Sequence, residues 1–249
     1  MTTKIIADAC CNHQGNKDNI KTMISSAGRV GIDYIKFQLY DVRNLHKDYP
    51  DYTSNYQYYD DHQVTDKVLD LILSQCKQAN IKPLFTLFHT GMVERLLSRD
   101  ISECKIASPD ALNIELIDEC LRAFDRVFIS TGMINAEGLK TLKGFINTKP
   151  YKGRAEFLYC VSEYPTHYSN VNFKEMMHYS GFSDHTPDIT ASKQAIDLSL
   201  NYVERHYILN KDTLTKDAFI SSDLTAFAEL CKYRDKVAKI NNYKLRWRG

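Results

Sequence analysis

The chain has 249 residues, of which 43% are hydrophobic and 25% charged, and its formal net charge at pH 7 is +1. These values are typical of one globular domain with a large core, and the near-neutral charge argues against nucleic acid as the main partner. Residues 232–249 are locally basic, which we interpret as the solvated face and the end of a final helix.

The seven cysteines form an odd set without a CxxC pair. No leader with charged, apolar and small-residue regions precedes Ile5, and no apolar run reaches the length of a membrane span. We therefore expect a reduced, cytoplasmic protein that is not inserted in a membrane and acts on a soluble substrate.

Short apolar runs alternate with segments of helical periodicity along the whole chain. Between the runs, apolar residues recur at spacings of three and four, as in residues 64–72 and 114–124. Strands are predicted at residues 4–10, 32–38, 82–88, 103–108, 126–131, 156–161, 181–185 and 202–209. Eight such alternations predict a single (β/α)8 TIM barrel over residues 1–249, with a doubly wound open sheet as the alternative.

One long irregular insertion, residues 40–62, follows the second predicted strand and is rich in Tyr and Asp. A loop of this length at the mouth of a barrel favours a role as a lid or a substrate wall. The alternative is a surface loop that takes no part in the chemistry.

Polar side chains gather where the predicted strands end, which is where a barrel of this class carries its site. Along the first six strands these residues are Asp8, Asn12, His13, Lys36, Gln38, Thr86, Lys105, Ser108, Asp110, Ser130, Thr131, Ser162, Glu163 and Tyr164.

Two lysines are predicted to point into the barrel. Side chains alternate along a strand, so Lys36 and Gln38 share the inner face, and an inward lysine needs an anionic partner. Lys36 and Lys105, with several hydroxyl groups nearby, therefore predict a site for a phosphate and a carboxylate on one small molecule. The alternative is that the lysines form structural ion pairs with Asp8 or Asp110.

The last two predicted strands flank a helix-like segment and are expected to pair in parallel. By alternation, Ser183 and His185 point the same way from one strand, and Glu204 and His206 point the same way from the other. Two histidines at the same depth of adjacent strands predict a divalent metal site, whereas a lone histidine is more often a satisfied core residue.

Seven segments then carry a resemblance to a known family, namely IADACCNHQG, KFQ, KIAS, STGM, YCVSEYPT, GFSDHT, and ERHYIL followed by Asp217. In their order and spacing, from Ile5 to about Ser221, the chain resembles the sialic acid synthase family. The resemblance implies an enzyme that condenses phosphoenolpyruvate with an aldehyde sugar, such as N-acetylmannosamine or a related hexose derivative. The products would be phosphate and a 2-keto-3-deoxy sugar acid such as N-acetylneuraminate.

The resemblance also implies roles for individual residues. His185 and His206 match the protein ligands of a divalent metal, commonly Mn²⁺, with Mg²⁺ or Co²⁺ as alternatives. Substrate contacts, to phosphoenolpyruvate or to the sugar, are implied for Lys36, Gln38, Thr86, Lys105, Ser108, Asp110, Ser162 and Ser183. Catalytic positions around the aldehyde and the metal are implied for Asp8, Tyr164, Glu204 and Asp217.

The chain departs from the family pattern at several of these positions. Asp8 stands where a Glu is usual, and Asp110 replaces a Glu that is often found there. Ser162 occupies a place that is Asn in some members, and Ala218 follows Asp217 where a His is usual. We expect Asp8 or Asp217 to transfer protons to or from the attacking water or the aldehyde oxygen, with either residue in either role.

Family members generally continue into an antifreeze-like carboxyl-terminal domain, which reaches across a dimer and supplies an arginine to the acyl group of the acceptor. This chain ends at Gly249, before such a domain. We expect a homodimer in which residues 40–62, a partner chain or no group at all recognises the acceptor, so that N-acyl groups are discriminated less than in full-length relatives.

Two other functions are compatible with the same residues. One is an aldolase or lyase that uses Lys36 or Lys105 as a Schiff base. The other is a non-catalytic relative that binds phosphoenolpyruvate or a sugar acid and serves as a partner subunit.

Overall fold

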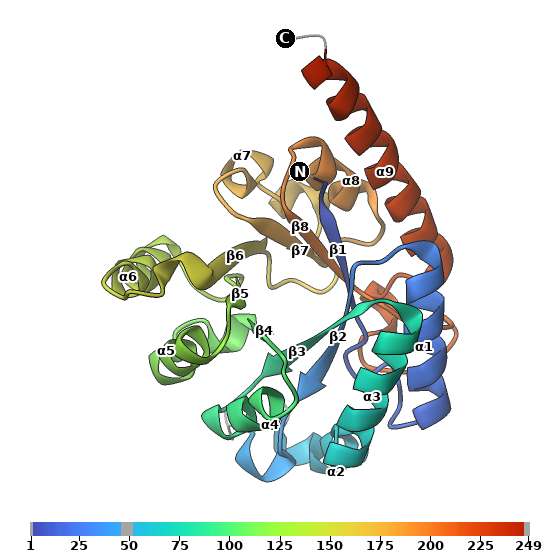
Figure 1. The fold of residues 1–249 in the computed structure, drawn as a ribbon, viewed down its shortest axis with the longest axis vertical. Helices are drawn as coiled ribbons and strands as arrows, with labels where there is room; N and C mark the ends of the chain where they lie inside the picture. Colours follow the sequence, from blue (N-terminus) through green and yellow to red (C-terminus); the bar gives the residue numbers. More distant parts are fainter. Residues whose placement is uncertain (1, 46–51, 247–249) are drawn as a thin grey trace.

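In the computed structural model, which describes residues 2–45 and 52–246, eight parallel strands close into a barrel surrounded by helices (Figure 1). The strands are β1 (Lys4–Asp8), β2 (Tyr34–Leu39), β3 (Lys82–Leu87), β4 (Glu103–Ile106), β5 (Arg126–Ser130), β6 (Ala155–Cys160), β7 (Gly181–Asp184) and β8 (Tyr202–His206). Each pairs with its neighbours along the chain, and β1 pairs with β8. The predicted (β/α)8 barrel is confirmed, because this last pairing excludes an open sheet.

The helices are α1 (Lys17–Val30), α2 (Tyr52–His62), α3 (Asp66–Ala79), α4 (Val93–Leu97), α5 (Ile114–Ala123), α6 (Ala136–Asn147), α7 (Phe173–Met176), α8 (Thr190–Asp197) and α9 (Leu224–Arg246). Local sequence sets their ends. In α1, the side chain of Asn16 accepts hydrogen bonds from the first-turn N–H groups, and the helix ends at Gly31 with a φ of 84°.

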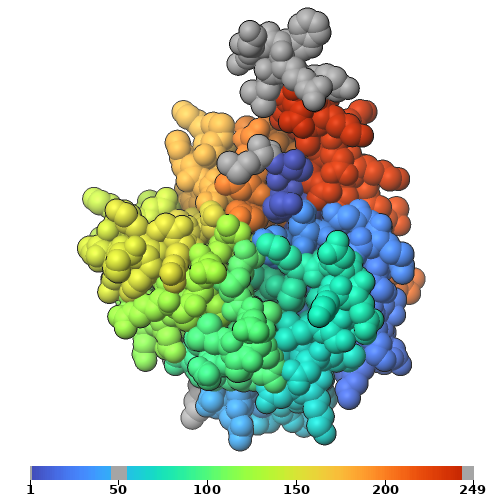
Figure 2. All heavy atoms as spheres, in the orientation of Figure 1, coloured from blue at the N-terminus to red at the C-terminus, as the bar shows by residue number. Residues whose placement is uncertain are grey.

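The final helix, α9, packs on α1 and α8 and then extends beyond the barrel (Figures 1 and 2). Within residues 2–45 and 52–246, no helix combines the length and the apolar character that a bilayer crossing needs. All seven cysteines lie in the described part of the chain and are free and buried, as the sequence predicts for a reduced protein.

The interior of the barrel is divided into an apolar floor and a polar pocket. A buried cluster inside the ring is formed by Ile6, Tyr34, Leu84, Phe128, Leu158 and Tyr202. Because side chains alternate along a strand, the next inward positions are Asp8, Lys36, Thr86, Ser130, Cys160 and Glu204. Six of the eight strands thus place an apolar residue toward the amino end and a polar residue two positions later, at the carboxyl end.

The predicted irregular insertion, residues 40–62, is wrong in part, because α2 (Tyr52–His62) is helical. Residues 46–51 lie outside the described residues. The sequence of α2 has no strong apolar stripe, and tertiary contacts stabilise it instead. The hydroxyl of Tyr40 donates to the carbonyl of Tyr59 at 3.0 Å, and the two rings meet edge to face at 6.1 Å.

A buried ion pair holds the ends of β7 and β8 from outside the barrel. Nη1 of Arg205 lies 2.5 Å from Oδ2 of Asp184, and both side chains are almost fully buried. The guanidinium also donates to the carbonyl of Thr186 at 2.8 Å and to the hydroxyl of Ser222 at 2.9 Å. These contacts fix the two strand ends whose inward neighbours are histidines.

We expect the Arg205→Met variant to lose about 3–5 kcal/mol of unfolding free energy, because Asp184 would remain as a buried charge without its partner. Urea denaturation measures this loss. The control is Lys193→Met, which removes the more exposed pair with Glu229 and should cost less than about 1 kcal/mol. Equal, small losses in both variants would contradict the expectation.

Candidate active site

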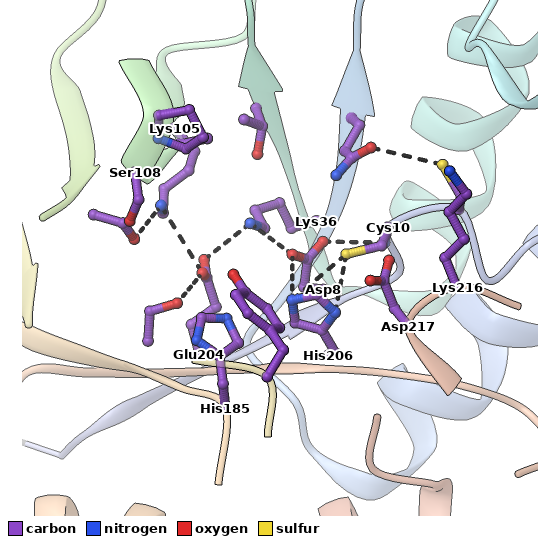
Figure 3. A pocket seen from close by; sticks show the side chains of 18 of the residues that line it. Asp8, Cys10, Lys36, Lys105, Ser108, His185, Glu204, His206, Lys216 and Asp217 are labelled. Atoms are coloured by element: carbon purple, nitrogen blue, oxygen red, sulfur yellow. Dashed lines mark hydrogen bonds and ion pairs between the residues drawn. The ribbon is translucent and has the colours of Figure 1, made fainter. Parts of the chain in front are cut away.

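A cavity of about 570 Å³ opens at the carboxyl ends of the strands, above the apolar floor (Figure 3). Its volume is in the range usual for small-molecule sites. Its walls include the sequence-predicted residues Asp8, Lys36, Gln38, Thr86, Lys105, Ser108, Ser162, Tyr164, Ser183, His185, Glu204, His206 and Asp217. The structure therefore brings these side chains together in one pocket.

Five polar residues from the strand ends are not among those that line the cavity, namely Asn12, His13, Asp110, Thr131 and Glu163. Asp110 ends a short 3-10 helix, η3 (Ser108–Asp110), and is not among the described residues that line the cavity. The side-chain amide of Asn12 donates to the carbonyl of Tyr207 and to the hydroxyl of Ser221, each at 2.9 Å. Asn12 thus ties the segment after β1 to the segments after β8.

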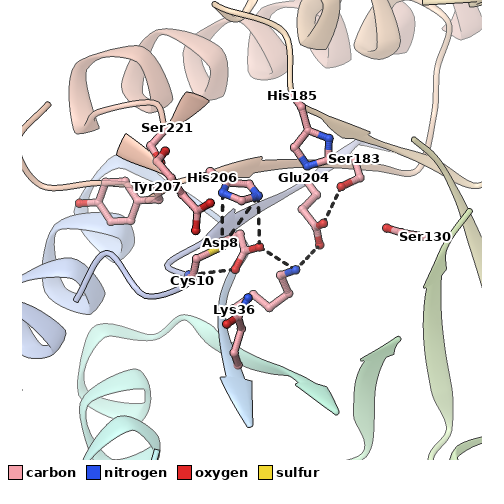
Figure 4. Close-up of polar contacts among 12 residues, drawn as sticks. Asp8, Cys10, Lys36, Ser130, Ser183, His185, Glu204, His206, Tyr207 and Ser221 are labelled. Carbon is pink, nitrogen blue, oxygen red and sulfur yellow. Dashed lines mark hydrogen bonds and ion pairs between the residues drawn. The ribbon is translucent and has the colours of Figure 1, made fainter. Parts of the chain in front are cut away.

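Charges of alternating sign cross the bottom of the pocket (Figure 4). Nζ of Lys36 lies 2.8 Å from Oδ2 of Asp8 and 3.3 Å from Oε2 of Glu204. Nζ of Lys105 lies 3.9 Å from the other oxygen of Glu204. Lys36 therefore forms an ion pair with Asp8, which is one of the two arrangements that the sequence allowed.

The ionisation of Asp8 follows from this network. Burial alone would raise the pKa of Asp8, but Lys36, His206 and Cys10, in decreasing order of effect, together outweigh burial and lower the pKa to about 2. Burial would likewise lower the pKa of Lys36, yet Asp8 and Glu204 raise it above its usual value. At neutral pH both groups are charged, so Asp8 can accept a proton but has none to donate.

Lys105 is a different kind of lysine. It is 1% exposed, and its ammonium donates to the hydroxyl of Ser130 at 2.5 Å and to the carbonyl of Ile106 at 3.1 Å. Burial lowers the pKa of Lys105 to about 8, and the more distant Glu204 offsets this only in part. The positive charge of Lys105 is therefore poorly balanced by protein carboxylates, so an anionic ligand would bind favourably beside it.

Hydroxyl groups surround Lys105. Thr86, its register partner across β3 and β4, is 2% exposed, and its Oγ1 finds no hydrogen-bond partner among the residues that the structure describes. The hydroxyl of Ser108 accepts from the backbone N–H of Gly132 at 3.1 Å. An ammonium group, a buried hydroxyl without a partner and further hydroxyls are the groups that bind phosphate.

Possible metal ligands lie on the opposite side of the pocket. Asp8, Cys10 and His206 each offer a ligand atom, and the three atoms lie within 4.8 Å of one another (Figure 4). Carboxylate, thiolate and imidazole are ordinary ligands of divalent transition metals. The donor chemistry of this side of the pocket therefore fits a metal ion.

His185 stands next to this group, with its ring centroid 5.2 Å from that of His206. Its Nδ1 lies 3.3 Å from the carbonyl of Val161, a contact that would leave Nε2 with a free lone pair. The ring of Tyr164 packs on His185 at 4.3 Å. The metal-ligand roles of His185 and His206 stay a prediction, to which the structure adds Asp8 and Cys10 as neighbouring donors.

One wall of the cavity comes from α2 and from the segment before α9. Tyr40, Tyr58 and Tyr59 line it, and Nζ of Lys216 lies 4.8 Å from the ring centroid of Tyr58. Asp217 follows on the same wall. The Tyr-rich segment therefore forms a wall of the pocket, as the sequence predicts for a functional insertion.

Several lining residues escaped the sequence analysis as site residues, namely Cys10, Cys11, Leu45, Phe88, Ala107, Pro109, Met133, Cys160, Lys216 and Phe219. Cys10 has a signal in the sequence, because it lies two residues after Asp8 at the end of a strand. Lys216 has one as well, since it precedes Asp217. The apolar residues carry no signal that distinguishes them from core residues.

A barrel with buried lysines and hydroxyls facing possible metal ligands defines an enzyme that acts on a small anionic substrate. Residues 23–245 match the model of the NeuB family, and the chain belongs to this family of sugar-acid synthases. Membership confirms that the chain is an enzyme of the sialic acid synthase class, which forms carbon–carbon bonds.

Relatives support this assignment. The chain is 26% identical to an N,N'-diacetyllegionaminic acid synthase of Legionella pneumophila, over 90% of this chain and 68% of the relative. It is 27% identical to the human N-acetylneuraminate-9-phosphate synthase, over 92% and 68% of the two chains. The fold matches a citrate complex of the N-acetylneuraminic acid synthetase of Leptospira borgpetersenii with a TM-score of 0.88 and 23% identity, over 96% of this chain and 85% of that one.

Proposed function

We propose that the chain condenses phosphoenolpyruvate with N-acetylmannosamine or a related hexose derivative, giving a 2-keto-3-deoxy sugar acid such as N-acetylneuraminate and releasing phosphate. The observation that carries the proposal is one cavity with an anion-binding side around Lys105 and a side of possible metal ligands around His206. The names of the relatives support the product class, since they are synthases of legionaminic, pseudaminic and neuraminic acids.

The anion side fits phosphoenolpyruvate. Lys105 would bind the phosphate together with Thr86 and Ser108, because Lys105 has no close carboxylate partner and Oγ1 of Thr86 has no hydrogen-bond partner among the described residues. Lys36, already bound to Asp8 and Glu204, can turn toward the carboxylate of the same substrate. Such fixed donors hold the alkene carbon against the sugar aldehyde and replace the water that the anion loses.

The metal side would hold a divalent ion through His185 and His206, for which the family resemblance implies Mn²⁺, with Mg²⁺ or Co²⁺ as alternatives. When bound, the ion would supply Lewis-acid activation of the aldehyde oxygen. Asp8 would stay ionised beside it. Tyr164 covers His185 and would limit the access of bulk water to this side.

The reaction balances as follows. The alkene carbon of phosphoenolpyruvate forms a bond with the aldehyde carbon, and the aldehyde oxygen takes a proton. Water adds at the carbon that bears the phosphate ester and loses a proton to a carboxylate such as Asp8 or Asp217. The hydroxyl group of the adduct then loses its proton to solvent while the carbon–oxygen bond to phosphate breaks, which leaves the keto group. Lys105 can supply a proton to the departing phosphate, because its pKa is about 8.

A second candidate is a Schiff-base aldolase, favoured by the buried amine of Lys105, since a lysine with a lowered pKa is the kind that forms Schiff bases. Borohydride would then trap a carbonyl substrate on Lys105. The absence of trapping, together with phosphate release, would exclude this candidate.

We expect purified chain with Mn²⁺ to release phosphate only when phosphoenolpyruvate and an aldehyde sugar are both present. The assay compares N-acetylmannosamine with its N-acylated and hydroxylated relatives, because the sugar is the least constrained part of the site. A matched control omits the sugar, and a second control uses Lys105→Met. Binding of phosphoenolpyruvate without phosphate release for any sugar would instead indicate a non-catalytic relative.

We expect His206→Ala and His185→Ala to hold less metal than the wild type after dialysis against Mn²⁺, because each removes an imidazole from a site with few protein ligands. Elemental analysis measures the metal content of each protein. His178→Ala, which removes an imidazole outside the residues lining the cavity, is the control. Equal metal content in all these proteins would contradict the proposed ligands.

A further inference from the structure

Cys10 places a sulfur atom against the possible metal ligands. It follows β1 with a φ of 42°, and its Sγ lies 3.3 Å from Nδ1 and 3.8 Å from Nε2 of His206. Its backbone N–H donates to Oδ1 of Asp8 at 3.1 Å. Cys10 is 1% exposed, so the sulfur faces the pocket and not the surrounding solvent (Figure 4).

The next cysteine in the chain has different surroundings, although both line the cavity. Sγ of Cys11 lies 3.7 Å from Oε1 of Gln38 and 3.9 Å from the hydroxyl of Tyr40. Only Cys10 of this adjacent pair belongs to the group whose ligand atoms lie within 4.8 Å of one another. Cys11 is therefore a matched control for the role of Cys10.

We propose that Cys10 is a thiolate ligand of the divalent metal, together with Asp8 and His206, and that this sulfur makes the site select Zn²⁺, Co²⁺ or Fe²⁺ over Mn²⁺ and Mg²⁺. The inference rests on the proposed function, because it deepens the metal side of the same pocket. On binding, the S–H bond of Cys10 is replaced by a sulfur–metal bond, and the proton leaves to solvent.

The donor set explains the selectivity. Mn²⁺ and Mg²⁺ favour oxygen ligands, whereas a thiolate favours softer ions. With one thiolate, one imidazole and one carboxylate, the site offers three different protein ligands and room for a substrate oxygen. His185 lies close enough to bind the same ion or to orient another ligand of it. The proposal therefore concerns the choice of ion and is compatible with His185 as a further ligand.

The test is titration of the metal-free chain with Co²⁺, followed by absorption spectroscopy. A cobalt–thiolate bond gives a charge-transfer band in the near ultraviolet, which oxygen and nitrogen ligands do not give. We expect one equivalent of Co²⁺ to produce this band in the wild type and in Cys11→Ser, and not in Cys10→Gly. Glycine is chosen because it adopts a positive φ without strain, so the variant keeps the local backbone.

Competition between metals gives an independent measurement. We expect the ratio of Zn²⁺ affinity to Mn²⁺ affinity to fall at least about tenfold in Cys10→Gly and to stay unchanged in Cys11→Ser. X-ray absorption of the zinc-loaded wild type should show one sulfur at about 2.3 Å, and that of Cys10→Gly should show none. Cys10→Ser, which keeps a side chain of similar size, repeats each comparison if the glycine variant does not fold.

The inference is overturned if bound Co²⁺ gives no thiolate band in the wild type, or if the band survives in Cys10→Gly. Failure of the proposed function looks different. A chain that shows the Cys10-dependent band but releases no phosphate keeps this metal site and loses the proposed reaction. Phosphate release without the band keeps the reaction and removes Cys10 from the ligands.

Discussion

Lys36→Met is expected to abolish detectable binding of phosphoenolpyruvate and also to lower the free energy of unfolding by about 3–5 kcal/mol. Both effects have one cause. Nζ of Lys36 lies 2.8 Å from Asp8 and 3.3 Å from Glu204, and all three side chains are buried. Methionine keeps the length of the side chain but leaves two carboxylates without this cation, in the same pocket that must receive a further anion.

The matched comparison is Lys105→Met. This change should weaken phosphoenolpyruvate binding as strongly but cost little stability, because burial already disfavours the charge of Lys105 and Glu204 keeps its contact with Lys36. Calorimetry measures binding, and urea denaturation measures stability. Adding Asp8→Asn to Lys36→Met should restore part of the lost stability. If Lys36→Met binds phosphoenolpyruvate normally, Lys36 serves only as an ion-pair partner.

Binding of phosphoenolpyruvate is expected to weaken about tenfold per pH unit above pH 8. Burial lowers the pKa of Lys105 to about 8, and the anion binds the charged form. The affinity is therefore highest well below pH 8, and it falls as the pH rises through this pKa and Lys105 loses its proton. The phosphate ester of phosphoenolpyruvate does not interfere, because the second pKa of a phosphate monoester is about 6 and the group is already doubly ionised in this range.

Other titratable groups that face Lys105 could also cause this pH dependence, and they determine which control variants are needed. Glu204, Lys36 and Asp8 keep their charges in this range. Burial would raise the pKa of Glu204, but Lys105 and then Lys36 lower it below its usual value, and Lys36 does the same for Asp8. Cys160 is different, because burial raises the pKa of its thiol but His185 outweighs burial and lowers it. Cys160→Ser should keep the pH dependence, and Lys105→Met should bind weakly at every pH. Loss of the dependence in Cys160→Ser would assign it to the thiol.

The sequence predicted the barrel and most of the pocket for a simple reason, which is that alternation along a strand is a local property. Lys36 and Gln38 had to share a face, and the pairs Ser183 with His185 and Glu204 with His206 had to do so as well. Since the carboxyl ends of all parallel strands lie at the same end of the barrel, these side chains meet in one site.

What the sequence could not provide depends on contacts between distant segments. Asp8 faces Lys36 because β1 and β2 pair in that register, and the alternative partner Asp110 could not be excluded beforehand. The helix α2 lacks an apolar stripe, so the sequence predicted neither the helix nor its contact with Tyr40. The place of Cys10, two residues after Asp8, can be seen in the sequence, but its backbone conformation with a positive φ cannot.

The apolar floor also constrains the order of events in a turnover. Since it closes the amino end of the barrel, every molecule enters and leaves through the same mouth. Lys105 lies at the bottom, 1% exposed, whereas Phe219 at the rim is 60% exposed. A molecule held at the bottom is covered by whatever binds above it. In the proposed reaction, phosphoenolpyruvate would therefore bind before the sugar, and phosphate formed at Lys105 would leave only after the new sugar acid.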